Sequence, residues 1–570
     1  MARDEEPLLA RRDTEASMGQ AEEDALLTGE PVHRGPRRGW GFWRQIGVFA
    51  WAVVATLAVI VVGVAYQKQL ADKNTTQKPT GKRNLIFMVS DGMGPTSLSL
   101  TRSYMQYAQD KPFNKQLVLD KHMIGQSRTR SSSSLVTDSA AGATAFSCGK
   151  KSYNGAISVL DDHSPCGTVL EAAHKAGYLT GLVVTTRLTD ATPATFAAHV
   201  NARDQEDEIA RQMIGVSHPL GRVVDLMLGG GRCFFLPKGT AGACRSDNED
   251  VVATAKKMGW SYASTRKDFD ALKGGKSVKL PMLGLFATED IPYEIDRRNE
   301  SDIYPSLDEM ARTALTALSE ATKDSEQGFF LMIEGSRIDH AGHANDPSAQ
   351  VHEVLAYDKA FSSVLDFLEK DSTPGVMVAT SDHETGGLAT ARQLRPTYPD
   401  YLWYPDALAN ATSSCERLTR RYYEYREAHP EIKNLTDYVA ESLRKGLGIY
   451  DATPAELEIL VNNPDYAPYG YADMISRRSQ TGWSTHGHSA ADVNIYSSCS
   501  HTAKALQGNH ENTEVGAFLR EYLDLDVDAI TKQLRGHSVL KPSWMGPLPA
   551  EGVRLDGQSH VEKYHGNFKY

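Results

Sequence analysis

Four short apolar runs in the sequence are each followed closely by acidic, hydroxyl or histidine side chains. The runs are residues 85–89, 182–184, 329–333 and 376–379. A continuous apolar run of this length is typical of a strand buried on both faces of a parallel sheet. Because the carboxyl ends of parallel strands meet at one edge, where ligands bind, we predict an α/β fold with a functional site at these strand ends.

Asp339 and His343 follow the third run at a spacing typical of metal ligands. They are four residues apart, so one helical turn would place a carboxylate and an imidazole on the same face, where both could bind zinc. A solvated surface turn would explain the same spacing. However, acids also follow the other runs, at Asp91, Asp190 and Asp382, and this recurrence favours a metal site.

The chain has 570 residues, of which 41% are hydrophobic, and this length alone would suggest about three or four domains. If Asp91, Glu334, Asp382 and a histidine near residue 488 meet in one site, most of the chain instead forms a single α/β domain with insertions. The net charge is −11 and no basic stripe is present, which argues against nucleic-acid binding.

Residues 1–45 are expected to form a disordered cytosolic tail. Residues 1–30 carry nine acidic side chains against three arginines and show no apolar periodicity. Within the tail, residues 4–9 and 22–27 each combine acids with a Leu-Leu pair, and both resemble acidic dileucine signals that cytosolic sorting adaptors bind. We expect one of the two to be accidental.

Residues 46–66 form an uncharged stretch of 21 residues, long enough to cross a hydrocarbon core of about 30 Å as a helix. The tail before it and the lack of a small-residue cleavage site favour a transmembrane signal anchor over a removable signal peptide. All six cysteines and the sequons at Asn74, Asn299, Asn410 and Asn434 follow this stretch. We therefore expect a single-pass type II glycoprotein with its C-terminal part in an oxidising lumen.

Composition divides the chain beyond the anchor into three segments. Residues 67–83 are polar and lysine-rich, and we expect them to form a luminal stalk. Residues 84–540 carry all the candidate site residues and should form the catalytic domain with its insertions. Residues 541–570 are rich in proline, glycine and histidine, and we expect a loosely held C-terminal tail.

The six cysteines could pair in chain order. The pairs would be Cys148 with Cys166, Cys233 with Cys244, and Cys415 with Cys499. Sequence alone allows fifteen connectivities, and free buried thiols are the alternative.

Ser139 stands at the start of a second stretch typical of a functional site. Small residues follow it and form a good helix start, which would place the Ser139 hydroxyl at the positive end of a helix, where an anion is favoured. Ser139 could serve simply as a helix cap. A zinc ion held by the nearby ligands could instead ionise this hydroxyl, so that no separate general base is required.

Six segments, in this order within residues 84–510, resemble the motifs of the alkaline phosphatase family. They are Asp91-Gly92-Met93-Gly94, Thr137-Asp138-Ser139-Ala140-Ala141, Asp190-Ala191-Thr192-Pro193, Glu334-Gly335 with Asp339 and His343, Asp382-His383-Glu384-Thr385-Gly386-Gly387, and Gly487-His488-Ser489. The resemblance implies a large, mostly parallel central sheet flanked by helices on both faces, a homodimer, and hydrolysis of phosphate monoesters. With its tail and anchor, the chain is most similar to the fungal vacuolar (repressible) members, which implies a place in the vacuole membrane.

The resemblance also implies roles for single residues. Ser139 would accept the phosphoryl group as nucleophile, and Arg203 would grip phosphate with its planar guanidinium. Two Zn²⁺ and one Mg²⁺ would be bound. The implied ligands are Asp339, His343 and His488 for the first zinc, Asp91, Asp382 and His383 for the second, and Asp91, Thr192 and Glu334 for magnesium, which Asp190 would reach through water. Because these groups hold only the phosphoryl group, broad specificity is implied.

Two histidines near the implied ligands leave alternatives. His486 lies two residues before His488, so either could be a ligand by spacing, and we choose His488 because Gly-His-Ser matches the family pattern. His340 could bring an imidazole to the third metal. Since successive side chains on a helix diverge by about 100° from Asp339, we expect His340 to stay off the metal.

Other functions of the same metal-site superfamily are weaker alternatives. Sulfatases need a Cys/Ser-x-Pro/Ala-x-Arg setting, which the residues around Ser139 lack, and phosphodiesterases usually use threonine as nucleophile. A membrane-anchored pseudoenzyme would normally have lost a ligand, and none of the implied ligands is missing.

Overall fold

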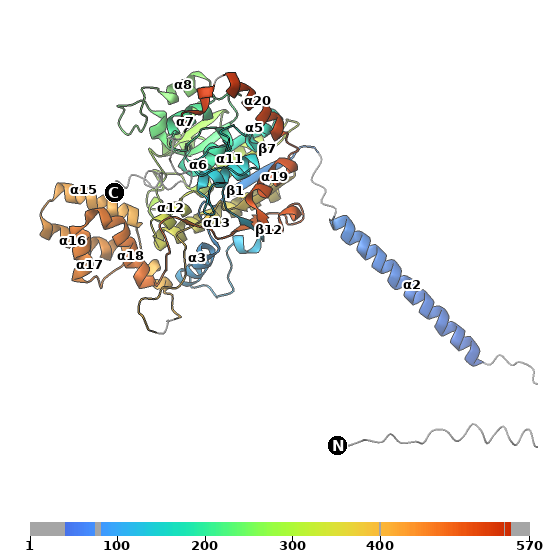
Figure 1. Ribbon diagram of the computed structural model, residues 1–570. Helices are drawn as coiled ribbons and strands as arrows, with labels where there is room; N and C mark the ends of the chain where they lie inside the picture. The colour runs from blue at the N-terminus through green and yellow to red at the C-terminus, as the bar shows by residue number, and fades with distance from the viewer. Residues whose placement is uncertain (1–39, 75–80, 398–400, 541, 549–570) are drawn as a thin grey trace, which may run out of the picture. The chain divides into compact units, whose positions relative to one another are not determined.

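The computed structural model describes residues 40–74, 81–397, 401–540 and 542–548 (Figure 1). The chain divides into two units between Thr75 and Thr76. The predicted sorting signals and most of the predicted C-terminal tail lie outside the described residues.

Helix α2, Trp40–Asn74, makes up the described part of the first unit and includes the whole predicted anchor at residues 46–66. Its stretch Trp43–Gly63 has a mean hydropathy of 2.5, and none of its most apolar window is buried. Within the described residues it is the one stretch of helix long and apolar enough to cross a membrane. At about 1.5 Å per residue, the 35 residues of α2 extend well beyond a hydrocarbon core of about 30 Å.

A ten-stranded sheet forms the centre of the second unit. Its order is β12-β2-β11-β8-β1-β7-β3-β4-β6-β5, and neighbouring strands are parallel except where β11 pairs with β2 and β8. The prediction of a large, mostly parallel sheet is confirmed. The strands are β1 (Asn84–Val89), β2 (Met123–Arg128), β3 (Leu179–Arg187), β4 (Leu226–Gly230), β5 (Ser261–Ala263), β6 (Met282–Leu285), β7 (Phe329–Glu334), β8 (Gly375–Thr380), β11 (Val493–Ser497) and β12 (Gly508–Glu511), with β9 (Glu384–Thr385) and β10 (His488–Ser489) forming a separate pair.

Strand β1 lies between β8 and β7 at the centre of the sheet. Its last residue, Val89, pairs with Glu334 at the end of β7 and with Thr380 at the end of β8. Strand β3 lies on the other side of β7, with Val183 opposite Ile333. The four predicted apolar runs are therefore four adjacent parallel strands, and their carboxyl ends meet at one edge of the sheet.

Helices cover both faces of the sheet. Successive side chains of a buried strand point to opposite faces, so each face has its own core of strand and helix side chains. On β1, Leu85 and Phe87 belong to one core cluster, whereas Ile86 and Met88 belong to another. The helices of the first cluster are α4 (Ser139–Cys148), α5 (Val169–Lys175), α6 (Ala191–Ala197), α7 (Glu206–Met213), α8 (Val251–Lys257), α19 (Asn512–Tyr522) and α20 (Val527–Leu540). Those of the second are α3 (Pro95–Ala108), α9 (Arg266–Ala271), α11 (Leu307–Ala321), α12 (Arg337–His343) and α13 (Pro347–Lys370).

A helical lobe interrupts the chain between β9 and β10 (Figure 1). Its side chains form a third core cluster, which includes Leu418, Val439 and Tyr471. This cluster also contains Leu100 of α3 and Ile295 of α10, Glu294–Arg297. The lobe is therefore a packed insertion, not a loop. Its helices are α14 (Pro405–Ala409), α15 (Cys415–Ala428), α16 (Ile432–Leu447), α17 (Pro454–Asn462) and α18 (Ala467–Ser479).

Two of the three predicted disulfides are present. Cys148 is bonded to Cys166, and Cys233 is bonded to Cys244, whereas Cys415 and Cys499 are free thiols. The prediction of the third pair is wrong. Cys415 packs in the core of the helical lobe, while Cys499 packs against the cluster on one face of the sheet.

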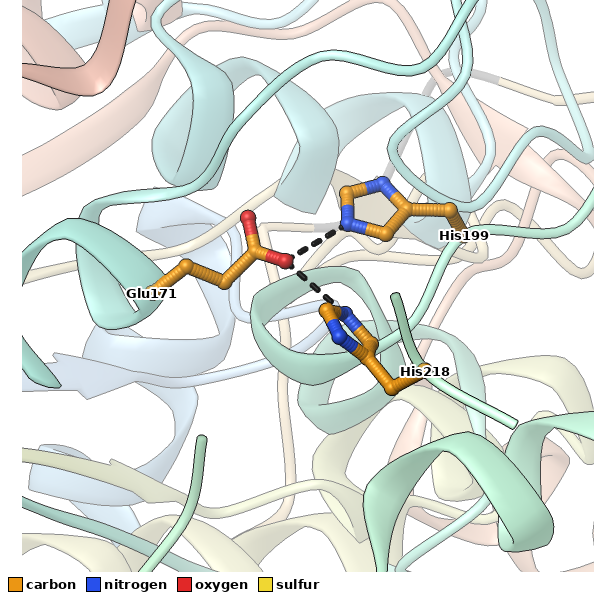
Figure 2. A group of neighbouring side chains, drawn as sticks. All are labelled: Glu171, His199 and His218. Carbon is orange, nitrogen blue, oxygen red and sulfur yellow. Dashed lines mark hydrogen bonds and ion pairs between the residues drawn. The ribbon is translucent and has the colours of Figure 1, made fainter. Parts of the chain in front are cut away.

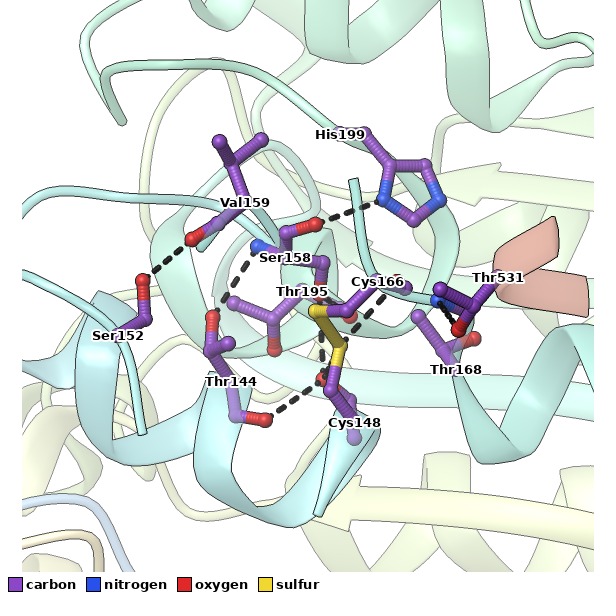
Figure 3. Close-up of a disulfide and its surroundings, with 12 residues drawn as sticks. Thr144, Cys148, Ser152, Ser158, Val159, Cys166, Thr168, Thr195, His199 and Thr531 are labelled. Carbon is purple, nitrogen blue, oxygen red and sulfur yellow. Dashed lines mark hydrogen bonds between the residues drawn. A yellow bond between two sulfur atoms is a disulfide. The ribbon is translucent and has the colours of Figure 1, made fainter. Parts of the chain in front are cut away.

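The disulfide between Cys148 and Cys166 fixes the C-terminal end of α4 (Figure 3). The segment that leads to Cys166 is itself tied to two helices. Ser158 N donates to Thr144 Oγ1 on α4 at 3.1 Å, and Ser158 Oγ donates to Thr195 O on α6 at 2.5 Å. Helix α4, which begins with Ser139, is thus connected to α6 through the segment that contains Ser158 and Cys166.

Candidate active site

Hydrogen bonds and close packing connect the turns that follow the central strands. Ser381 Oγ, after β8, donates to Ser90 O, after β1, at 2.5 Å. Gly92 lies against α12 with a φ of +76°, and a Cβ at this position would lie 2.5 Å from Asp339 Cα, so only glycine fits. These contacts bring Asp91 and Asp382 together at the edge where the strands end.

Asp339, His343 and His488 form the first group of side chains that could hold a metal ion. His343 Nε2 and His488 Nε2 lie 3.0 Å apart, at 3.2 and 3.5 Å from Asp339 Oδ1. The Nδ1 atoms of the two rings face the carbonyl oxygens of His486 and Thr137 and therefore carry the protons. Two Nε2 lone pairs then face each other beside a carboxylate, an arrangement that a bound cation would stabilise.

Asp91, Asp382 and His383 form a second such group, next to Ser139 at the first turn of α4. His383 Nε2 lies 3.4 Å from Asp91 Oδ1, 3.2 Å from Asp382 Oδ2 and 3.0 Å from Ser139 Oγ. Asp91 Oδ1 and Asp382 Oδ2 are buried and accept no hydrogen bond from the residues that the structure describes. Buried carboxylate oxygens without donors fit a metal ion.

Thr385 joins the two groups, which the sequence analysis did not foresee. Its hydroxyl donates to Asp339 Oδ1 at 2.5 Å, because a carboxylate can only accept. The same oxygen is therefore free to accept from His383 Nδ1, which lies 3.2 Å away. This bond leaves the lone pair of neutral His383 on Nε2, directed at Asp91, Asp382 and Ser139.

Carboxylates crowd the site, and their mutual repulsion is visible in their pKa values. Burial, followed by the charges of Asp382, Asp339, Glu334 and Asp190, raises the pKa of Asp91 well above its usual range. Burial, together with Asp190 and Asp382, raises the pKa of Glu334 to about 8. Since such a cluster is favourable only when cations balance it, the electrostatics fit metal binding.

Glu334, Thr192 and Asp190 supply further oxygen atoms near Asp91. Ser336 Oγ donates to Glu334 Oε2 at 2.5 Å, and Thr192, buried on the first turn of α6, lies close enough to Glu334 to oppose the rise of its pKa. Asp190 caps α6 and accepts from Ala191 N at 2.7 Å. Hard oxygen donors of this kind suit magnesium.

Arg203 lies between the start of α4 and the start of α6. Its guanidinium is 3.0 Å from Asp190 Oδ1 and 3.3 Å from Asp138 Oδ2. Asp138 precedes Ser139 and caps α4 by accepting from Ala141 N at 3.0 Å. The sequence analysis did not assign a role to Asp138, although its place before a helix of small residues was a signal for a cap.

Neither of the two histidines that left alternatives belongs to the first or the second group of candidate ligands. His486 Nδ1 faces His343 O at 2.8 Å, so it is His488 that lies with Asp339 and His343. His340 Nδ1 lies 3.3 Å from Asp290 Oδ2.

A third group of candidate ligands, Glu171, His199 and His218, lies outside this site and was not predicted. Both Nε2 atoms face Glu171 Oε1, at 2.8 and 2.9 Å (Figure 2). His218 Nδ1 accepts from Leu220 N at 3.1 Å, so its proton is on Nε2, and a protonated nitrogen cannot bind a metal. His199 Nδ1 faces Ser158 O at 3.0 Å. We interpret the group as a buried ion pair of His199 with Glu171.

Comparisons with known proteins agree with this architecture. The sequence model of the family described as "Alkaline phosphatase" matches residues 82–525. The chain is 50% identical over 568 residues to the repressible alkaline phosphatase of Saccharomyces cerevisiae, covering 96% of this chain and 98% of that protein. It is 46% identical over 525 residues to an alkaline phosphatase of Schizosaccharomyces pombe, covering 90% and 94%.

Solved structures give the same result. Thermus thermophilus alkaline phosphatase superposes with a TM-score of 0.66 at 28% identity, covering 81% of this chain and 98% of that chain. A variant of the alkaline phosphatase from the Antarctic bacterium TAB5, with Mg bound in its M3 site, superposes with a TM-score of 0.54 at 28% identity, covering 79% and 100%. From the match of the family model and the identity to the two yeast proteins, this chain belongs to the alkaline phosphatase family, whose members are phosphoric monoester hydrolases.

Proposed function

We propose that this alkaline phosphatase hydrolyses phosphate monoesters of broad specificity through a phosphoserine intermediate on Ser139. The observation that carries the proposal is the 3.0 Å contact between Ser139 Oγ and His383 Nε2, at the start of a helix and beside the second ligand group. The proposed ligands are Asp339, His343 and His488 for one Zn²⁺, Asp91, Asp382 and His383 for a second, and Asp91, Thr192 and Glu334, with Asp190 through water, for Mg²⁺.

The bound ions would supply positive charge that lowers the pKa of a coordinated hydroxyl and balances charge that develops on phosphoryl oxygens. Ser139 Oγ loses its proton and forms a bond to phosphorus as the bond to the leaving oxygen breaks, and that oxygen takes up a proton and departs as the alcohol. In the second half, a water molecule loses a proton and its oxygen bonds to phosphorus, the bond to Ser139 Oγ breaks, and Ser139 Oγ takes up a proton. Two inversions give net retention at phosphorus.

Arg203 is proposed to bind the phosphoryl group beside Ser139. It is held by Asp138 and Asp190 on one side, and its planar fork suits two phosphate oxygens. Since none of the proposed groups holds the alcohol, the leaving group should have little influence. The Mg-containing TAB5 variant supports magnesium as the ion of the third site.

We further propose that α2 anchors a type II protein in the vacuole membrane, with the second unit in the lumen, glycosylated and acting as a homodimer, and with a sorting adaptor recognising the cytosolic tail. The apolar stretch Trp43–Gly63 supports the anchor. The two disulfides support an oxidising compartment. The similarity to the S. cerevisiae protein over 96% of the chain supports a shared organisation.

The decisive test is the variant Ser139→Ala in the purified, metal-loaded protein. Turnover of an aryl phosphate monoester should fall by roughly a thousandfold or more, while zinc and magnesium content stays unchanged, because only the nucleophile is lost. Acid quenching of the wild type should trap phosphate on Ser139. Near wild-type turnover in the variant would refute the nucleophile, and faster cleavage of the matching diester would favour a phosphodiesterase.

A further inference from the structure

Arg187, the last residue of β3, is a buried arginine that no step of the proposed reaction uses. Each of its three guanidinium nitrogens contacts a different carboxylate. Nη2 lies 3.0 Å from Asp190 Oδ2, Nε lies 3.0 Å from Glu206 Oε2, and Nη1 lies 3.1 Å from Asp290 Oδ1.

The contacts of Arg187 constrain the position of Arg203 in two ways. Asp190 uses Oδ2 for Arg187 and Oδ1 for Arg203, so the position of Arg187 determines which oxygen faces Arg203. Glu206, at the first turn of α7, follows Arg203 by three residues, and Thr189 Oγ1 also donates to it at 2.5 Å. Arg187 thereby fixes both the partner of Arg203 and the chain directly after it.

We propose that Arg187 is a positioning residue that sets where Arg203 presents its guanidinium to the phosphoryl group. The inference rests on the proposed role of Arg203. Lysine could not replace Arg187, because an ammonium is a compact point charge and cannot reach three carboxylates at fixed angles. With lysine, Asp190 is free to rotate and to pair with Arg203 through both oxygens, which competes with phosphate.

The test compares the full-length, metal-loaded wild type with Arg187→Lys. We expect KM for an aryl phosphate and the inhibition constant of inorganic phosphate to rise by roughly 2- to 30-fold, with a smaller change in kcat. A purely structural role would lower the melting temperature and the active fraction but leave both constants unchanged, and this outcome overturns the proposal. Arg245→Lys is the matched control, since Arg245 is also buried but pairs with Asp247; both constants should stay at wild-type values.

A double-mutant cycle with Asp190→Asn tests whether Arg187 acts on Arg203 through Asp190. If Arg187 acts through Asp190, Arg187→Lys should have little further effect on the phosphate constant in the Asp190→Asn background. A full, additive effect there contradicts the route through Asp190, on which the expected rise of the two constants rests. If Arg187→Lys does not fold, Arg187→Met combined with Glu206→Gln removes one charge of each sign and gives the same measurement.

Arg203→Ala separates this inference from the proposed function. If Arg203→Ala leaves the phosphate constant unchanged, the role of Arg203 itself is wrong. If Arg203→Ala raises it and Arg187→Lys does not, only the positioning role of Arg187 fails.

Discussion

At the scale of single residues, the partner of Nδ1 in each of three histidine rings determines that Nε2 is the nitrogen that faces the acidic side chains. Backbone carbonyl oxygens hold Nδ1 of His343 and His488, and Thr385 holds Nδ1 of His383. The spacing of Asp339 and His343 on one helical turn indicated His343 as a ligand, whereas His383 and His488 were inferred from the resemblance to the family. The sequence could not indicate the carbonyl oxygens that bind Nδ1 of His343 and His488, because they come from distant segments, and it gave no signal that Thr385 binds Nδ1 of His383.

Thr385→Val should weaken metal binding in both groups proposed to hold zinc. Valine keeps the shape of the buried side chain but removes the hydroxyl that bonds Asp339 and His383. We expect zinc affinity to fall by roughly 10- to 100-fold, measured by competition with a chelator. Thr385→Ser, which keeps the hydroxyl, is the control and should stay close to wild type. Equal affinities for the valine and serine variants would contradict this role.

At the scale of secondary structure elements, the sequence indicated the four central strands well. An apolar run that ends on an acid marks both the buried strand and its ligand-bearing end, so β1, β3, β7 and β8 could be predicted with their site residues. The helical lobe and the free state of the Cys415 and Cys499 thiols could not. Which core a helix or a thiol joins depends on packing between distant segments, and Cys415 lies in the lobe while Cys499 lies at the sheet.

Replacing the disulfide at the end of α4 should destabilise the catalytic unit. The bond between Cys148 and Cys166 closes a loop with a sequence separation of 18, and closing such a loop contributes about 3 kcal/mol to the free energy of unfolding. The double variant Cys148→Ser with Cys166→Ser should lose this amount in denaturant unfolding. Cys499→Ser, at a free thiol, should change stability by less than about 0.5 kcal/mol. A comparable loss in Cys499→Ser would show that Cys499 is bonded.

The buried pair of His199 and Glu171 should make stability depend on pH. Burial lowers the pKa of His199, but the Glu171 carboxylate raises it, and the net result is a pKa above the ordinary value of about 6.5. The stability that His199 contributes is therefore full below about pH 6.5 and is lost as the pH rises through the folded pKa. The pKa of Glu171 is lowered, so its own contribution is lost only in acid.

His199→Gln measures this contribution. The variant should be less stable than wild type by about 3 kcal/mol near pH 6, because it leaves a buried carboxylate without its charged partner. The difference should shrink as the pH rises through the folded pKa of His199, where the wild-type imidazole loses its charge. Thermal unfolding across this range of pH gives the comparison, with the exposed His501→Gln as control. A difference that grows with pH would show that His199 is neutral in the folded protein.

At the scale of the whole molecule, the chain combines one apolar helix with one large α/β unit. The proposed type II orientation predicts that protease added to sealed vesicles removes only the tail before α2. Glycosidase should then shift the protected fragment on a gel, because the sequons at Asn299 and Asn410 lie on it. Detergent should expose the whole chain and serves as the control. Protection of residues 1–45 in sealed vesicles would reverse the orientation.

The placement of β1 between β7 and β8 has a consequence for how the protein is made. Gly92 N donates to Asp382 Oδ1 at 3.4 Å across a separation of 290 residues. A ribosome adding about 5 to 20 residues per second needs roughly 15 to 60 s to cover that distance. During that interval Asp91 has already emerged while its partners do not yet exist. The growing chain therefore cannot assemble the second ligand group, and any ion it is to carry must be acquired after translation has passed residue 383.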